Sequence, residues 1–220
     1  MDKKAPFVTV EGVDGAGKSS HIKTIVKALE DAGWKVILTR EPGGTPLAEE
    51  FRHMILREEM ALTTEIMLAF TARAEHIDKV IKPSLEAGIA VVCDRFTDST
   101  YAYQGMGRKG DLELIEMLEQ KIHGDLTPDM TLLFDLPISV SKKRLEGTGK
   151  IPDKFESQNE IFFEDVRKGY QQRVAQSERF VVIDSSVPVE EVSQNVENAM
   201  NDFVANNFSM VKKNKSKLKF

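Results

Sequence analysis

The amino-acid sequence predicts an α/β fold, a doubly wound five-stranded parallel sheet with helices on both faces. Short apolar segments alternate with longer segments of helical periodicity, which is the pattern of repeated βα units. A glycine-rich loop also joins the first strand-like segment to the first helical one, as in sheets that bind phosphates at the carboxyl ends of their strands. The 220 residues, 41% of them hydrophobic, are enough to bury the core of one such domain.

Five short apolar runs are the expected strands, at residues 7–11, 36–38, 89–93, 131–135 and 180–183. The first helix follows the glycine-rich loop, since Ile22, Ile25 and Leu29 recur at helical spacing and Gly33 ends the pattern. Similar patterns predict helices over 46–59, 63–87, 111–122, 139–146, from about 158, and over 188–206. Strands that alternate with helices in this way pair in parallel, so ligands are expected at the carboxyl edge of the sheet.

Charge and composition restrict the class of protein. The formal net charge is −5, and five lysines lie within the last nine residues, so the rest of the chain carries −5 − 5 = −10. An acidic body disfavours a nucleic-acid partner, which normally meets a basic face. No apolar run approaches the ~20 residues of a membrane span, so no membrane partner is expected.

We expect one domain over residues 1–207, with a polar lid segment at about 147–157, and a basic, disordered tail over 208–220. The chain runs directly into its first strand, so no secretory leader is expected. The single cysteine, Cys93, lies in an apolar run and is expected to be a buried thiol rather than a reactive one. These features predict a cytoplasmic protein without disulfides.

The glycine-rich loop carries the strongest chemical signal, because it fits the phosphate-loop pattern G-x-x-x-x-G-K-[ST] in full. The glycines let successive N–H groups turn toward phosphate oxygens, and the amino end of the helix favours the anion. Lys18 is expected to reach the β- and γ-phosphates of ATP, and the Ser19 hydroxyl to ligate Mg²⁺. With the serine that follows, the expected ATP-binding set is Gly12, Val13, Asp14, Gly15, Ala16, Gly17, Lys18, Ser19 and Ser20.

The loop predicts a bound nucleoside triphosphate but does not identify the acceptor. A GTPase needs a guanine-reading Asn-Lys-x-Asp stretch, and the one Asn-Lys pair, at Asn214, is followed by Ser216 and Lys217. Helicases and transport ATPases are normally larger than this chain. A small-molecule kinase needs further basic residues for a second anionic substrate, and three clusters supply them, at residues 40–45, 70–76 and 94–105.

The three clusters read Arg-Glu-Pro-Gly-Gly-Thr, Phe-Thr-Ala-Arg-Ala-Glu-His and Asp-Arg-Phe-Thr-Asp-Ser-Thr-Tyr-Ala-Tyr-Gln-Gly. Together with the phosphate loop and Glu11 before it, they resemble the thymidylate kinases, above all the bacterial branch. The resemblance runs from residue 7 to about 205, with the elements in the expected order. It implies a P-loop kinase fold with a short lid, a homodimer, and transfer of the ATP γ-phosphoryl group to dTMP, giving dTDP and ADP with Mg²⁺.

The resemblance also assigns roles in the acceptor site. Arg95, at the end of a strand beside the loop, is expected to fork onto the acceptor phosphate, although it could instead pair with Asp94 or Asp98. Asp94 is also expected to contact a water on Mg²⁺. Phe70 and Arg73 share a helix face, which suits stacking of Phe70 on the pyrimidine and a hydrogen bond from Arg73 to its edge. Many family members place the aromatic residue four before the arginine, so ordinary core packing is the alternative for Phe70.

Further acceptor-site roles rest on the resemblance alone. Thr100 and Gln104 resemble the pair that reads thymine. Tyr103 resembles the residue that packs under the sugar and disfavours a ribose 2′-hydroxyl. The remaining residues expected to line the acceptor site are Asp14, which would face the 3′-hydroxyl, Glu41 and Arg52.

The lid departs from the family pattern. Bacterial members usually present an arginine there that stabilises charge on the transferred phosphoryl group, and this chain has Lys154 at the matching position. Because lysine lacks the planar fork of arginine, we expect Lys154 to be a weaker substitute, and a solvated lysine is the alternative. Its candidate helpers are Lys150, Arg40 and Arg167. Arg144, just before the lid, resembles the residue that packs against adenine, although it could equally lie on a surface helix.

The expected catalysis is alignment of two phosphates and neutralisation of their charge. The acceptor oxygen is already anionic near neutral pH, since phosphomonoesters have a second pKa near ~6, so no general base is needed. The residues expected to take part are Lys18, Arg95, Asp14, Glu41 and Lys154. Two alternatives remain, namely another nucleotide or nucleoside kinase of the same fold, and an ATP-binding module whose altered lid has weakened catalysis.

Overall fold

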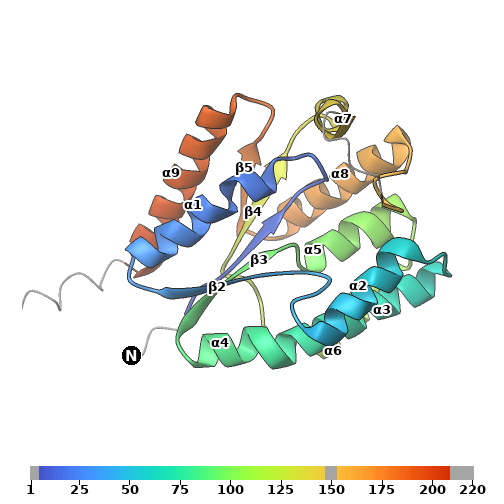
Figure 1. The fold of residues 1–220 in the computed structure, drawn as a ribbon, viewed down its shortest axis with the longest axis horizontal. Helices are drawn as coiled ribbons and strands as arrows, with labels where there is room; N and C mark the ends of the chain where they lie inside the picture. The colour runs from blue at the N-terminus through green and yellow to red at the C-terminus, as the bar shows by residue number, and fades with distance from the viewer. Residues whose placement is uncertain (1–4, 147–152, 209–220) are drawn as a thin grey trace, which may run out of the picture.

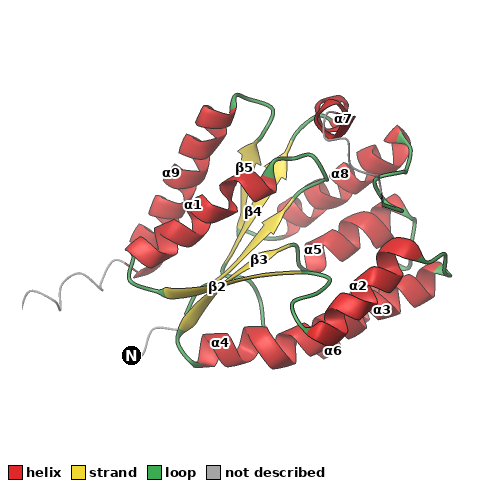
Figure 2. Cartoon of the chain, viewed as in Figure 1, coloured by secondary structure: helices red, strands yellow, loops and turns green. Residues whose placement is uncertain are grey.

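The five expected strands form one parallel sheet. A computed structural model describes residues 5–146 and 153–208, and within them the strands are β1 (Phe7–Glu11), β2 (Lys35–Arg40), β3 (Ile89–Asp94), β4 (Met130–Asp135) and β5 (Phe180–Asp184). Their order across the sheet is β2-β3-β1-β4-β5, and every neighbouring pair is parallel. Figure 2 draws the strands in yellow. The fold class predicted from the alternating pattern is confirmed.

Helices cover both faces of the sheet (Figure 1). One face carries α1 (Lys18–Asp31) and α9 (Val189–Phe208), which lie side by side. The other face and the carboxyl edge are covered by α2 (Pro46–Arg57), α3 (Leu62–His76), α4 (Lys82–Glu86), α5 (Thr97–Thr100), α6 (Leu112–His123), α7 (Ile138–Glu146) and α8 (Glu160–Gln176). This two-sided arrangement is the doubly wound architecture that the sequence predicted.

Two helical stretches contain π-helical turns. The helix expected over 63–87 is divided into α3, a π-helical segment η1 (Ile77–Ile81) and α4. A second π-helical segment, η2 (Tyr101–Gly107), continues α5 and carries Tyr103 and Gln104. A π-helical turn changes which residues share a face, and such turns are frequent at functional sites. Helical periodicity in the sequence does not reveal them.

The middle of the sheet sets the position of the glycine-rich loop. All five residues of β1 are buried, whereas the edge strands β2 and β5 are partly exposed. Val8 and Val10 of β1 share one apolar cluster with Ile25 and Leu29 of α1. Because β1 pairs with both β3 and β4, the loop after it leaves the sheet at the point where open α/β sheets bind ligands.

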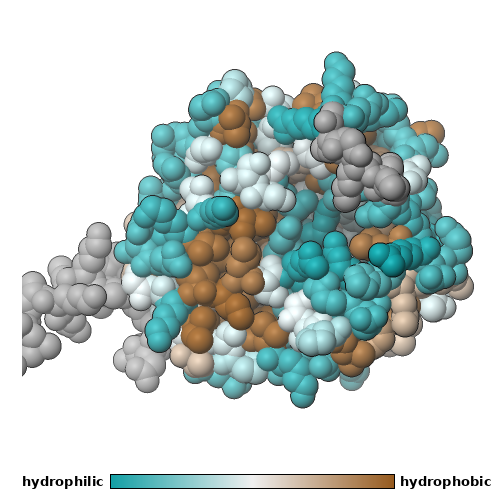
Figure 3. Space-filling model, in the orientation of Figure 1, coloured by the Kyte–Doolittle hydropathy of each residue, from teal (hydrophilic) through white to brown (hydrophobic). Residues whose placement is uncertain are grey.

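The edge strand β2 leaves an apolar patch on the surface (Figure 3). Ile22, Ile37, Leu38 and Val80 line a shallow groove there, and 51% of Leu38 is exposed. Arg40 and Asp94 also line this groove, so it reaches the carboxyl ends of β2 and β3.

Some expectations fall outside the described residues. Most of the expected lid, residues 147–152 with Lys150 among them, and the basic tail from residue 209 belong to this group. Within the described ranges, no helix is both long enough and apolar enough to cross a membrane.

Candidate active site

The clusters that the sequence singled out meet at the carboxyl edge of the sheet. Glu11 and Asp94 are the last residues of the neighbouring strands β1 and β3. The residues after the strands stay tied to this edge, since the Arg95 amide donates to the Val10 carbonyl at 2.9 Å and the Glu41 amide donates to the Asp94 carbonyl at 2.9 Å. The phosphate loop, Glu41 and Arg95 therefore start from adjacent points.

The phosphate loop has the backbone that its glycines allow. Gly12, Gly15 and Gly17 all have positive φ, of 139°, 77° and 85°. At Gly12 a Cβ atom would lie 2.5 Å from the Phe134 carbonyl oxygen, so only glycine fits between the loop and β4. Gly17 directly precedes the first helical residue, Lys18, so the loop opens onto the amino end of α1.

Lys18 is folded back onto the loop. Its Nζ donates to the carbonyl oxygens of Gly12 at 3.0 Å and Val13 at 3.4 Å. Burial and the neighbouring Arg95 charge lower the pKa of Lys18 to about 8, because both disfavour a second cation in this site. An anionic phosphate in the loop would reverse that effect. Ser19 and Ser20, the next two residues of α1, are exposed.

Arg144 lies beside the loop, on α7. Its Nη2 donates to the Ser185 carbonyl at 2.9 Å, and its Nη1 lies 3.9 Å from the position of a Cβ at Gly17. The same helix holds the loop through Ser141, whose hydroxyl donates to the Asp14 carbonyl at 2.6 Å. Arg144 therefore lies beside the glycine that precedes α1, and its contact with adenine stays a prediction.

Arg95 joins the loop to the acceptor side. It adopts a left-handed backbone with φ of 67°, unusual for a residue with a side chain. Its Nη2 donates to Asp14 Oδ1 at 2.7 Å and to the Tyr103 hydroxyl at 3.1 Å, and its Nη1 donates to the Gly12 carbonyl at 3.0 Å. Its carboxylate partner is therefore Asp14. Asp98, one of the partners considered from the sequence, is bound instead by Arg173 and Arg179, each at 2.8 Å.

Asp14 is held as an anion. Burial alone would raise the pKa of Asp14, but the charges of Arg95 and Lys18 and the hydrogen bonds from Tyr103 and Arg95 outweigh it and lower that pKa to about 2. The Tyr103 hydroxyl donates to Asp14 Oδ2 at 2.8 Å. The loop acid Asp14 and Arg95 thus form one charged unit at the side of the phosphate loop.

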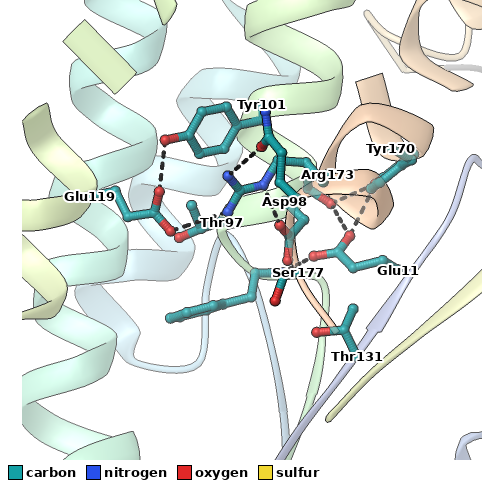
Figure 4. Close-up of polar contacts among 12 residues, drawn as sticks. Glu11, Thr97, Asp98, Tyr101, Glu119, Thr131, Tyr170, Arg173 and Ser177 are labelled. Atoms are coloured by element: carbon teal, nitrogen blue, oxygen red, sulfur yellow. Dashed lines mark hydrogen bonds and ion pairs between the residues drawn. The ribbon is translucent and has the colours of Figure 1, made fainter. Parts of the chain in front are cut away.

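Glu11 and Tyr170 belong to the same network but were not among the expected site residues. Glu11 accepts from the Phe96 amide at 2.7 Å, the Ser99 hydroxyl at 2.6 Å and the Tyr170 hydroxyl at 3.0 Å (Figure 4). Tyr170, on α8, also accepts from Arg95 Nη1 at 3.0 Å. Burial raises the pKa of Glu11 to about 7, and the nearby Asp98 adds to the shift. Glu11 could have been predicted as a site residue, because the sequence shows a carboxylate at the end of a buried strand. No feature of the sequence pointed to Tyr170.

A cavity of about 90 Å³ lies next to this charged unit. Arg73 lies on its wall, and Arg73 Nε donates to Glu41 Oε2 at 2.7 Å while Nη2 donates to Thr100 Oγ1 at 3.1 Å. Arg73 Nη1 is buried and has no acceptor among the described residues. Of the expected acceptor residues, the cavity brings together Asp14, Glu41, Arg52, Arg73, Arg95, Thr100, Tyr103 and Gln104.

Phe70 is the expected acceptor residue that does not line this cavity. It lies in a core cluster with Ile66 and Ile115 and is 1% exposed. Arg73 Cζ lies 4.7 Å from the centre of the Phe70 ring and 5.3 Å from the centre of the Phe96 ring, and Phe96 does line the cavity. Phe96 is therefore an aromatic ring of the cavity wall beside Arg73, whereas Phe70 packs in the core on the same helix as the arginine.

Lys154 lies on the acceptor side of the site. Its Nζ is 2.8 Å from Glu65 Oε2 and donates to the Glu58 carbonyl at 2.9 Å. Its neighbours Asp153 and Phe155 line the acceptor cavity, whereas Lys154 itself does not. In this arrangement the lid lysine is held by α3 and the end of α2, and its charge is paired.

The two described helpers considered for Lys154 are also paired. Arg167 forms a two-pronged ion pair with Asp135 at 2.7 and 2.8 Å, and Arg40 forms one with Glu49 at 3.2 and 2.8 Å. A phosphoryl group would have to draw either arginine away from its carboxylate.

Asp94 has a carboxylate oxygen that a bound cation could contact. Its Oδ1 is buried and accepts no hydrogen bond from the described residues. A buried carboxylate oxygen without a donor is unfavourable unless a cation or water meets it. Since β3 and β1 are neighbours, Asp94 lies at the same edge of the sheet as the loop that carries Ser19. Carboxylate and hydroxyl oxygens are the ligands that Mg²⁺ prefers, so this pair fits such an ion.

Comparison with known proteins agrees with this geometry. The family model described as thymidylate kinase matches residues 10–196. A thymidylate kinase of Methylobacillus flagellatus is 50% identical over 200 residues, which cover 90% of this chain and 98% of the relative. Those of Bordetella pertussis and Pseudomonas fluorescens are 48% and 46% identical, over 93% and 88% of this chain and 99% and 94% of each relative. The chain belongs to the thymidylate kinase family.

Proposed function

We propose that this protein transfers the γ-phosphoryl group of ATP to the 5′-phosphate of dTMP, giving ADP and dTDP. The observation that carries the proposal is the acceptor cavity, which adjoins the phosphate loop through Asp14 and Arg95 and has Arg73 on its wall, whose buried Nη1 has no acceptor among the described residues. Membership of the thymidylate kinase family supports both substrates. The phosphate loop would hold ATP, and Arg144 would pack near its adenine.

Electrostatics supports a reaction without a general base. The acceptor phosphate ionises with a second pKa near ~6, so its attacking oxygen is already anionic at neutral pH. Two cations, Lys18 and Arg95, would bind the phosphates on either side of the transferred group. Arg95 is now bound to Asp14, so an acceptor phosphate would compete with that carboxylate for the guanidinium fork. Lys154 would help in turnover only by leaving Glu65.

We propose Mg²⁺ as the cofactor, with the Ser19 hydroxyl and Asp94 as its protein contacts, Asp94 directly or through water. When bound with ATP, the ion would neutralise charge on the phosphates. The unpartnered, buried Asp94 Oδ1 supports this assignment.

The base would be read by a donor and an acceptor. Thymine offers an O4 acceptor next to an N3–H donor, whereas cytosine offers an N4 donor next to an N3 acceptor. Arg73 can supply the donor, and the Gln104 amide can supply the acceptor. Thr100 would hold Arg73, to which it is bonded, and Phe96 would stack on the ring.

The sugar would lie toward the charged unit. Tyr103 lines the cavity with its hydroxyl on Asp14, and we propose that its ring packs under the deoxyribose, where a 2′-hydroxyl would be crowded. Asp14 would face the 3′-hydroxyl. Glu41 and Arg52, which also line the cavity, would complete its wall near β2.

We further propose a single P-loop kinase domain over residues 1–207 that works as a homodimer in the cytoplasm. Met67 of α3 and Met117 of α6 are both exposed, and these two contacting helices are where we expect a second copy to pack. The one cysteine is a buried free thiol, which suits a reducing compartment. Light scattering would give the mass of the assembly.

Arg73→Met tests the acceptor site. We expect the variant to bind dTMP about 100-fold more weakly by calorimetry, because the unpaired donor and the Glu41 ion pair are both lost. The rate of ADP release with dTMP should fall together with the affinity for dTMP. Arg57→Met, at an exposed position near the end of α2, is the matched control and should bind dTMP as the wild type does. Unchanged dTMP affinity in a folded Arg73→Met variant would overturn the assignment of the cavity.

A further inference from the structure

Glu65 is a buried carboxylate that the proposed reaction does not use. It lies in the first turn of α3 and is fully buried. Its Oε1 accepts from Gln104 Nε2 at 3.0 Å, and its Oε2 is bound by Arg108 at 2.7 Å and by Lys154 at 2.8 Å. A buried charge of this kind is tolerated because two cations and an amide meet it. Because Glu65 is hydrogen-bonded to Gln104, which lines the cavity, it can affect how the cavity binds its ligand.

The contact with Gln104 decides which end of that amide is available. A side-chain amide has a donor end and an acceptor end of nearly equal size, and its partners determine how they are placed. An ionised carboxylate can only accept hydrogen bonds. The end of Gln104 that faces Glu65 must therefore be Nε2, which leaves the carbonyl Oε1 as the free end of a residue that lines the cavity.

The orientation of the Gln104 amide matters because thymine and cytosine place donor and acceptor in opposite order at N3 and at the group on C4. A Gln104 carbonyl and an Arg73 donor on the wall of one cavity would match the N3–H and O4 of thymine or uracil. The same pair opposes cytosine at both positions, since its N3 is an acceptor and its N4 a donor. If the Gln104 amide could turn over, its Nε2 would instead match the cytosine N3. The choice of base then depends on what prevents the turn.

We infer that Glu65 is a positioning residue for base selection, which locks the Gln104 amide with its carbonyl toward the base. This rests on the proposed binding of dTMP in the cavity. The ion pairs with Arg108 and Lys154 keep Glu65 an obligate acceptor, so the lid lysine supports the lock from the opposite side. The sequence alone pointed to Gln104 and Lys154 separately, and Glu65 is the residue through which they are joined.

Glu65→Gln is the direct test. Glutamine at 65 can donate as well as accept, so the Gln104 amide is no longer held in one orientation. Calorimetry with dTMP and dCMP should show that the wild type prefers dTMP and that this preference falls about tenfold in the variant, the effect of roughly one hydrogen bond. In a Gln104→Met background, Glu65→Gln should not change the preference, because Glu65 acts through Gln104.

A matched control distinguishes this positioning role from a nonspecific loss of structure when a carboxylate is removed. Glu119→Gln also changes a carboxylate that is bonded to a neutral group and an arginine, here Tyr101 at 2.7 Å and Arg173 at 3.5 Å, but outside the acceptor cavity. It should leave the preference for dTMP unchanged. If Glu65→Gln does not fold, Glu65→Asp keeps the charge but withdraws the carboxylate from Gln104, and it should lower the preference in the same direction.

The outcomes are distinct. An unchanged preference in folded Glu65→Gln or Glu65→Asp, or an equal fall in Glu119→Gln, would overturn the inference about Glu65 while leaving dTMP as the acceptor. A wild-type protein that binds dCMP as tightly as dTMP would instead count against the proposed acceptor itself.

Discussion

Replacing Glu11 by glutamine should remove a pH dependence from the stability of the fold. Glu11 is fully buried, and burial, with help from the nearby Asp98, raises its pKa from 4.5 to about 7. Glutamine can keep the bond from the Phe96 amide through its carbonyl and can donate to Ser99 or Tyr170 through its amide. The change therefore removes the titration and keeps the shape.

The size and sign of the change in the free energy of unfolding follow from the pKa shift of Glu11. Below pH 4.5 the carboxyl group is protonated in the folded and unfolded chains alike, so it has no differential effect. As the pH rises, the unfolded chain releases the proton first, and the free energy of unfolding falls until the folded group also ionises near pH 7. A shift from 4.5 to about 7 corresponds to roughly 3 kcal/mol of lost stability above pH 7.

Urea denaturation at pH 5, 6, 7 and 8, without nucleotide or Mg²⁺, measures this effect. Relative to Glu11→Gln, the wild type should lose about 2–3 kcal/mol between pH 5 and pH 8, since titrating groups that do not interact with Glu11 contribute equally to both proteins. Asp14→Asn is the control, because the pKa of Asp14 is lowered to about 2 and the group stays ionised over the whole range. Parallel stability curves for the wild type and Glu11→Gln would refute the reasoning.

Two further predictions concern the loop and its arginine. Gly12→Ala should destabilise the fold by about 3 kcal/mol or more, because φ is 139° and the new Cβ would meet the Phe134 carbonyl at 2.5 Å. Gly88→Ala, with φ of 74° and nothing within 4 Å, should cost only about 1–2 kcal/mol, and equal losses in urea denaturation would contradict the steric argument. Arg95→Lys should lower kcat/KM for dTMP about 100-fold, because lysine keeps the charge but not the two-sided fork. Wild-type turnover in that variant, measured by ADP release, would exclude bidentate binding of the acceptor phosphate.

The architecture was accessible from the sequence because its determinants are local. Buried parallel strands are continuous apolar runs, and the phosphate loop needs glycines where the backbone has positive φ, as at Gly12 and Gly17. The strand β2 is longer than its apolar run, since Lys35 and Arg40 pair in the ladder with exposed side chains. Helical periodicity did not predict the π-helical turn η2, which packs closely against α8, where a Cβ at Gly169 would lie 2.8 Å from Ala102 Cα.

The arrangement of side chains was less accessible, because it depends on contacts between distant segments. Phe70 and Arg73 do share a helix face, but the side of that face which meets the cavity could not be read from their spacing. Lys154 was considered because it stands in place of the family's lid arginine, whereas its contact with Glu65 joins residues 89 positions apart. The roles assigned to the cavity residues stay predictions until the variants are measured.

The acceptor itself is the central claim. ADP release should be measured with dTMP, dUMP, dCMP and AMP in parallel, with ATP and Mg²⁺ in excess. The donor and acceptor on the cavity wall predict that dTMP is phosphorylated fastest and that dCMP and AMP are poor substrates. Equal rates for all four, or a clear preference for AMP, would contradict the account.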